Sequence, residues 1–135
     1  MTPEGVAHVR ATAAAATRDP RFADAFYEGL FRRAPAIRPM FPASIGDQAQ
    51  KFSDQLAAIL RSLDDFDAFR GEASALGVRH AAYGVEARHY TIATDALIEA
   101  LRATLGDAID ADTEEAWRAA LDLIAEEMQA AGAGD

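Results

Sequence analysis

One stretch decides how this chain is interpreted: LGVRHAAYGV at residues 76–85, followed by RHY at residues 88–90. Upstream of His80, apolar residues recur at helical spacing, so one helix face carries apolar side chains and ends in an imidazole. The members of this face are Phe69, Ala73, Leu76 and His80. Such a histidine either hydrogen-bonds within the core or offers a lone pair to a bound group. Taken alone, His80 fits the first role better, so the rest of the chain must decide.

Composition limits the class of protein. The 135 residues carry 13 basic and 22 acidic side chains, for a net charge of −9, which argues against nucleic acid and anionic membranes as partners. Half of the residues are hydrophobic, but no apolar run approaches the ~20 residues of a membrane span. The start lacks the features of a secretory signal, so we expect a cytoplasmic protein of one domain, residues 1–135. With no cysteine, disulfides and thiolate metal sites are excluded.

The chain predicts an all-α fold. Ala, Leu, Glu and Arg dominate, and no alternating apolar-polar run of strand length occurs. Capping residues followed by proline open the first two helices, and prolines 35, 39 and 42 restrict the next segment to one tight turn. The expected helices run from Thr2 to about Thr17, from Asp19 to about Arg33, and from a cap at Ser44–Asp47 through Arg61.

The second half of the chain continues this pattern. A break at 62–67 precedes a shorter helix that leads to His80 and ends at Gly84. The next helix spans residues 87–105, and Asp112–Glu115 caps the last one, in which Trp117 lies on an apolar face. Residues 131–135 are expected to fray.

Three features point to the space in front of His80. Tyr27 lies on the apolar stripe of the second helix, Gln48 lies one turn before Phe52, and Phe41 sits in a proline-rich corner. Each has an ordinary explanation: a core aromatic, a first-turn glutamine bent toward water, and loop packing. Together they favour a pocket that faces the imidazole.

In these residues the chain resembles a globin over about residues 5–130, and most of all the bacterial single-domain globins similar to the haem domain of flavohaemoglobins. The shared features are a Phe-Tyr-x-x-Leu-Phe segment with a following proline corner, a distal-helix glutamine, a proximal basic-His motif and a tryptophan in the last helix. The matching residues are Phe26–Phe31, Pro35, Ile37 and Phe41; Gln48, Lys51 and Phe52; Arg79, His80, Tyr83, Val85 and Tyr90; and Trp117.

The resemblance implies a globin fold around haem b, with His80 as the proximal ligand of the iron. It also implies that the Tyr27 hydroxyl, with the Gln48 amide as a second donor, stabilises a polarised dioxygen ligand on the other side of the haem. One such bond is worth ~1.5–3 kcal/mol when the acceptor carries charge. The remaining expected haem contacts are Phe41, Phe52, Arg79, Val85 and Tyr90.

The chain also departs from the flavohaemoglobin pattern. It ends at residue 135 without flavin and nicotinamide domains, so we expect no reductase of its own. A glutamate that accompanies the proximal histidine in that family would fall near Gly132, which carries no carboxylate. Phe52 replaces a smaller aliphatic residue beside the ligand and is expected to crowd the pocket.

Three functions remain open. We favour a globin with pentacoordinate iron that reversibly binds dioxygen, nitric oxide or carbon monoxide, as in oxygen transport, and that is a monomer or weak homodimer. The alternative is a nitric oxide dioxygenase, an enzyme that would depend on a separate reductase. The third is a haem-free helical interaction domain, and His80 counts against it because such modules generally lack the proximal histidine.

Overall fold

The computed structural model describes residues 1–133, in which helices account for all of the regular secondary structure. This confirms the predicted all-α class. The elements are α1 (Pro3–Thr17), α2 (Pro20–Arg33), the 3-10 helix η1 (Pro35–Met40), α3 (Gly46–Arg61), α4 (Phe66–Ala82), α5 (Ala87–Leu105), the short 3-10 helix η2 (Gly106–Ala108) and α6 (Ala111–Ala133).

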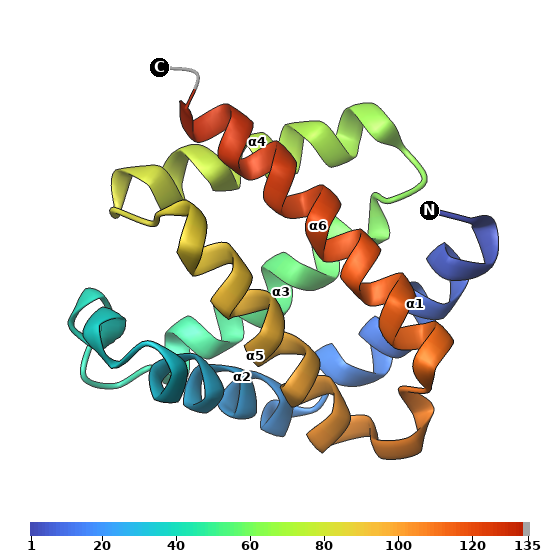
Figure 1. Ribbon diagram of the computed structural model, residues 1–135, viewed down its shortest axis with the longest axis horizontal. Helices are drawn as coiled ribbons and strands as arrows, with labels where there is room; N and C mark the ends of the chain where they lie inside the picture. Colours follow the sequence, from blue (N-terminus) through green and yellow to red (C-terminus); the bar gives the residue numbers. More distant parts are fainter. Residues whose placement is uncertain (134–135) are drawn as a thin grey trace.

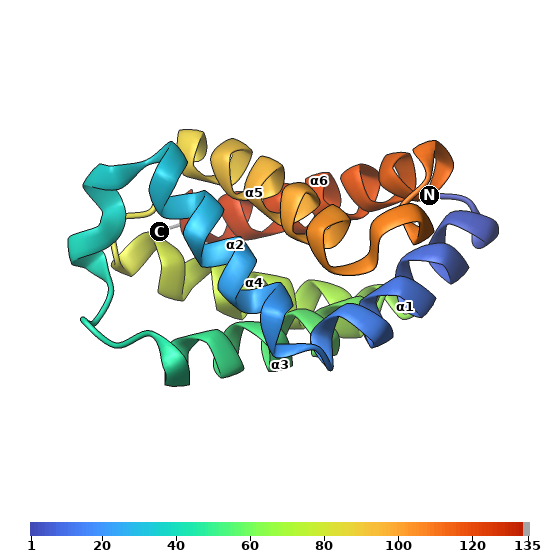
Figure 2. The ribbon, with the colours of Figure 1, turned by 90° about the horizontal axis from the view of Figure 1, so that it is seen from below.

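The helices pack in two layers that cross one another. Seen edge-on, α5 and α6 lie on one side and α1, α3 and α4 on the other, while α2 crosses in front of them (Figure 2). In the face-on view α6 runs diagonally across the molecule, and α4 crosses it near its C-terminal end (Figure 1). The turn between α4 and α5 therefore lies at the same end of the molecule as the last turns of α6.

The first two helices begin where the sequence predicts. The Thr2 side chain accepts a hydrogen bond from the Gly5 amide at 3.0 Å, and Asp19 accepts one from the Arg21 amide at 3.0 Å. In both helices a proline occupies the first position, where its missing N–H costs nothing. The three prolines of the next segment are compatible with η1, a single stretch of 3-10 helix.

Two of the predicted caps are wrong. α3 begins after Ile45, with no hydrogen bond from a capping side chain, so neither Ser44 nor Asp47 serves as its N-cap. α6 begins at Ala111, and its cap is Asp110, which accepts a hydrogen bond from the Thr113 amide at 2.8 Å. The predicted cap at Asp112 instead lies within the first turn, where a carboxylate still favours the positive end of the helix dipole.

The helix that carries His80 is longer than predicted. The sequence predicted a helix shorter than α3, but α4 has 17 residues and α3 has 16. α4 starts as early as Phe66 because Asp65 accepts a hydrogen bond from the Ala68 amide. The predicted break therefore ends at Asp65. At the other end of the chain, α6 continues to Ala133 and so includes residues 131–133, which were expected to fray; residues 134 and 135 lie outside the described part.

The core lies where the layers meet. As predicted, one face of α6 is buried, and Trp117 on that face is fully inaccessible to solvent. The indole Nε1 of Trp117 donates a hydrogen bond of 2.7 Å to the hydroxyl of Thr12 and so ties α6 to α1. Among residues 1–133, no helix combines the length and the apolar character needed to cross a bilayer.

Candidate functional site

His80 lies in the last turns of α4 and is partly buried. Its Nδ1 is 2.9 Å from the carbonyl oxygen of Leu76, one turn earlier on the same helix. Because a carbonyl only accepts, this bond places the proton on Nδ1 and leaves a lone pair on Nε2. A backbone carbonyl thus fixes both the tautomer and the orientation of the ring, as a metal-binding histidine requires.

The surroundings of His80 favour the neutral imidazole. Burial lowers the pKa of His80, the hydrogen bond to Leu76 opposes that change, and the nearby Arg79 guanidinium lowers the pKa further. Only the neutral ring can offer the Nε2 lone pair, so the environment keeps His80 in its ligating form. Arg79 itself is exposed beside it.

Aromatic residues from three elements surround Tyr27, which is 3% exposed on α2. The ring centroid of Tyr27 lies 5.7 Å from that of Phe41, which follows η1, and 5.7 Å from that of Phe52 on α3. Phe52 also stacks in parallel on Phe26, with centroids 4.3 Å apart. The structure therefore brings Tyr27, Phe41 and Phe52 together, as the sequence predicts, and adds Phe26 to the group.

The hydroxyl of Tyr27 is kept protonated. Burial raises the pKa of Tyr27, and a hydrogen bond from the Gln48 side chain partly offsets this rise. Gln48, in the first turn of α3, is partly buried, and its hydrogen bond to Tyr27 places it beside the phenol rather than out in water. A phenol that stays protonated can act as a hydrogen-bond donor.

Arg38 holds the corner that carries Phe41. Its guanidinium donates hydrogen bonds to the carbonyl oxygens of Phe41, Pro42 and Ala43 at 3.3, 2.9 and 2.8 Å. The same group lies 5.0 Å from the centroid of the Phe31 ring. One arginine thus fixes the backbone after η1 through several bonds, which orders a segment that has no helical bonds of its own.

Val85 and Tyr90 lie away from this aromatic group. Both line a hollow of about 300 Å³ between the end of α4 and the end of α6. Gly132 lines the same hollow, at the position where the flavohaemoglobin register places a glutamate. As a glycine it has no carboxylate, or any other side-chain group, to place there. Tyr83, the remaining aromatic of the proximal motif, is 74% exposed and points to solvent.

His89 has a role that the sequence interpretation missed. It is buried, and its Nδ1 accepts a hydrogen bond of 2.8 Å from the amide of Glu86, which closes a reciprocal cap at the start of α5. The signal was present, because a Glu followed three residues later by a polar side chain has the spacing of a capping box. The Leu76 carbonyl was missed for another reason: every residue has one, and its use depends on the rotamer of His80.

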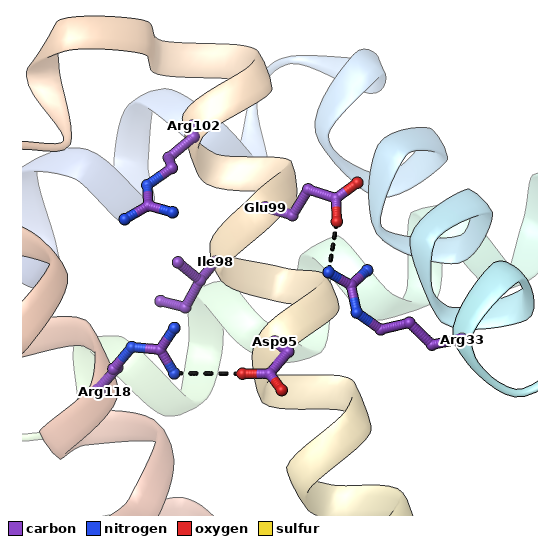
Figure 3. A pocket seen from close by; sticks show the side chains of 6 residues that line it. All are labelled: Arg33, Asp95, Ile98, Glu99, Arg102 and Arg118. Atoms are coloured by element: carbon purple, nitrogen blue, oxygen red, sulfur yellow. Dashed lines mark hydrogen bonds and ion pairs between the residues drawn. The ribbon is translucent and has the colours of Figure 1, made fainter.

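A second hollow, of about 270 Å³, lies among charged side chains of α2, α5 and α6 and shares no residue with the groups above. Figure 3 shows the ion pairs that line it, Arg33 with Glu99 and Arg118 with Asp95. Among residues 1–133, no group of three or more His, Asp or Glu side chains is arranged to hold a metal ion.

Comparison with known proteins now decides the family. Residues 24–128 match the family model described as Globin. The chain belongs to the globin family. A flavohaemoprotein of Deinococcus radiodurans is 30% identical over 132 residues, which cover 95% of this chain and 33% of that protein. One of Halalkalibacterium halodurans is 30% identical over 104 residues, or 75% of this chain and 25% of the relative. The globin chain thus spans about a quarter to a third of the flavohaemoproteins that it matches.

Solved structures agree with this assignment. A bacterial globin from Campylobacter jejuni superposes with a TM-score of 0.86 at 21% identity, covering 97% of this chain and 96% of that one. An engineered carbene transferase from Rhodothermus marinus, named as a candidate nitric oxide dioxygenase, gives a TM-score of 0.87 at 26% identity, covering 99% and 94%. The globin fold predicted from the sequence is therefore confirmed.

Proposed function

We propose that this globin binds haem b through His80 and reversibly binds dioxygen, nitric oxide or carbon monoxide at pentacoordinate iron. Bound haem would supply the ferrous iron at which a diatomic gas binds. The observation that carries the proposal is the hydrogen bond of 2.9 Å between His80 Nδ1 and Leu76 O, because it leaves Nε2 free in a neutral ring. The relatives support it, since several are named flavohaemoproteins.

The chain's own residues would divide the work between two sides of the cofactor. His80 would hold the iron, and Arg79 and the Val85–Tyr90 segment would lie next to it on the proximal side. Tyr27 keeps a protonated hydroxyl in a nearly water-free aromatic setting, and Gln48 is hydrogen-bonded to it. A donor placed in such a setting stabilises a polarised ligand more strongly than it would in water. Phe41 and Phe52 pack around the donor and exclude solvent from it.

The test of haem binding is a titration of the purified protein with haemin, followed by spectra of the reduced form with and without carbon monoxide. We expect one haem per chain and a high-spin ferrous spectrum that becomes low-spin on adding carbon monoxide. His80→Ala should lose the haem or retain it only with added imidazole. His8→Ala is the matched control, because His8 is exposed on α1. Stoichiometric haem with an unchanged ferrous spectrum in His80→Ala would refute the assignment.

A second function, nitric oxide dioxygenase with a separate reductase, is favoured by the Rhodothermus marinus neighbour and by the flavohaemoprotein relatives. The two functions differ in turnover. Each conversion of nitric oxide and bound dioxygen to nitrate would leave ferric haem, which needs one electron before the next cycle. When a reductase system and both gases are supplied, a dioxygenase is re-reduced after each cycle and forms many equivalents of nitrate, whereas a carrier that the reductase does not reduce stops after one equivalent. Nitrate measured per haem over time separates them, and His80→Ala reports the haem-independent background.

A further inference from the structure

Gly77 lets the backbones of two helices touch, three residues before His80. A Cβ added at Gly77 would lie 2.2 Å from the carbonyl oxygen of Met128 and 2.5 Å from its Cα. Both atoms belong to the backbone of α6, which cannot move aside as a flexible side chain can. On the α6 side, a Cβ at Gly132 would lie 3.3 Å from the Gly77 oxygen and 3.0 Å from the Cβ of Ala81. This is the crossing of α4 and α6 visible in Figure 1.

Close approach is the physical reason for glycine at this position. A glycine inside a helix costs roughly 0.5–1 kcal/mol relative to alanine. Gly77 lies inside α4, and the residues of the described chain with positive φ are Gly84 and Gly106. Backbone conformation therefore does not require glycine at position 77. Gly71, on the same helix, is exposed and would meet nothing within 4 Å if a Cβ were added. The two glycines of α4 therefore differ in whether a neighbouring backbone occupies the space that a Cβ would need.

The crossing is joined directly to the hydrogen bond that orients His80. The carbonyl that accepts from His80 Nδ1 belongs to Leu76, and it shares a rigid planar peptide unit with the nitrogen of Gly77. Any displacement of Gly77 away from α6 therefore also moves the acceptor that fixes the imidazole ring. The hollow of about 300 Å³ borders this crossing, because Gly77, Met128 and Gly132 all line it. Side-chain packing therefore does not fill that side of the contact between the two helices.

We propose that Gly77 is a positioning residue: by letting α4 seat on the backbone of Met128, it sets where the Nε2 of His80 lies relative to the haem iron. This inference rests on the proposed function, because it concerns the haem-bound protein. A ligand displaced by about an ångström is expected to bind its partner much more weakly, since functional groups must be held within ~0.5 Å of the productive geometry.

Gly77→Ala tests this in the haem-reconstituted protein, with Gly71→Ala as the control for the same change on the same helix. The measurements are the rate of haem loss to excess apomyoglobin and the iron–histidine stretching band of the ferrous form by resonance Raman spectroscopy. We expect haem loss from Gly77→Ala to be faster by roughly ten- to a hundredfold, together with a shifted or split band. Gly71→Ala should stay within about twofold of wild type, because it adds only helix propensity.

Gly132→Ala is the milder variant and decides the question if Gly77→Ala does not fold. Its Cβ would lie 3.0 Å from the Cβ of Ala81 and 3.3 Å from the Gly77 oxygen, both well beyond the 2.2 Å approach at Gly77, so a shift of a few tenths of an ångström accommodates it. It should shift the same band in the same direction by a smaller amount. An unchanged iron–histidine band and haem-loss rate in whichever of the two variants fold would overturn the inference. Failure of the wild type to bind haem would instead refute the proposed function, so the two failures are distinguishable.

Discussion

Tyr27 combines deep burial with a hydroxyl that remains a donor, and this sets what its removal should do. We predict that Tyr27→Phe speeds dioxygen dissociation by roughly ten- to a hundredfold, because the lost charge-assisted bond is worth ~1.5–3 kcal/mol. Carbon monoxide release should change far less, since bound carbon monoxide carries little charge and gains little from a donor. Stopped-flow measurement of both off-rates checks the difference.

Two further variants sharpen this experiment. Gln48→Leu should have a weaker effect in the same direction, and the double mutant should be non-additive because both groups address one ligand. Tyr83→Phe removes a phenol that is 74% exposed and lies outside the aromatic group, so it serves as the control. A dioxygen off-rate in Tyr27→Phe within a factor of about two of wild type, less than 0.5 kcal/mol, would mean that the phenol is not the donor.

The burial of Tyr27 also predicts that the free energy of unfolding falls at alkaline pH. The folded state raises the pKa of Tyr27 above its ordinary value of 10.0, so the stability that the neutral phenol contributes is complete below pH 10. It is lost as the pH rises toward the folded pKa, because the unfolded chain ionises first. We predict that the free energy of unfolding falls less steeply above pH 10 in Tyr27→Phe than in wild type, measured by urea unfolding of the haem-free protein.

The control for the alkaline experiment is Tyr83→Phe, because Tyr83 is 74% exposed and is solvated in both states. Parallel slopes for wild type and Tyr27→Phe above pH 10 would contradict the prediction.

For single residues, the sequence predicted which side chains face the site better than it predicted the backbone groups that hold those side chains in place. Helical spacing placed His80 at the end of the stripe through Phe69 and Ala73, both of which are buried in the structure. The spacing of Gln48 and Tyr27 on two inward faces predicted residues that the structure brings together. The Leu76 carbonyl and the contact of Gly77 with Met128 could not be predicted, because they depend on a rotamer and on a helix crossing between distant segments.

Among the helices, the hydroxyl of Thr12 links α1 to the buried tryptophan of α6. Thr12 donates to the His8 carbonyl at 2.7 Å and accepts from the Trp117 indole at 2.7 Å, so both hydrogen-bonding roles are used. We predict that Thr12→Val lowers the free energy of unfolding by ~1–3 kcal/mol, because the buried indole N–H loses its partner while the volume is kept. Urea unfolding followed by tryptophan fluorescence measures this, since Trp117 is the sole tryptophan.

Thr12→Ser keeps the hydroxyl and is the matched control. The ion pairs of Figure 3 give a second comparison, because their side chains are about half exposed and such pairs contribute ~0–1 kcal/mol. If Thr12→Val proved no more destabilising than Arg118→Gln, the hydroxyl would not be the tie between these helices.

Element boundaries show what local chemistry can decide. Where a capping residue is followed by proline, as at Thr2 and Asp19, the start was predicted correctly, because two local preferences coincide. At α6, Asp110 and Asp112 are both chemically suitable caps, and the fold uses the earlier one. Tertiary packing decides between such equivalents, as it also extends α6 to Ala133 through the contact of Gly132 with α4.

At the scale of the whole molecule, the residues proposed to surround the haem come from different elements. Tyr27, Phe41 and Phe52 come from α2, the turn after η1 and α3, whereas His80 comes from the end of α4. A group bound by all of them would add contacts between the end of α4 and the aromatic group that Tyr27, Phe41 and Phe52 form. Its free energy of binding would add to the stability of the fold, because the unfolded chain holds no such site.

We therefore predict that stoichiometric haemin stabilises the wild-type protein against heat. At a concentration about a thousandfold above the dissociation constant, binding adds roughly 4 kcal/mol, which corresponds to a rise in Tm on the order of 10–20 °C for a chain of this length. His80→Ala should show a much smaller rise, while its haem-free form should melt near the wild-type value because His80 is only partly buried. Thermal unfolding by circular dichroism measures all four states. Equal melting temperatures with and without haemin would contradict the prediction and would favour a haem-free helical interaction domain, the third function considered from the sequence.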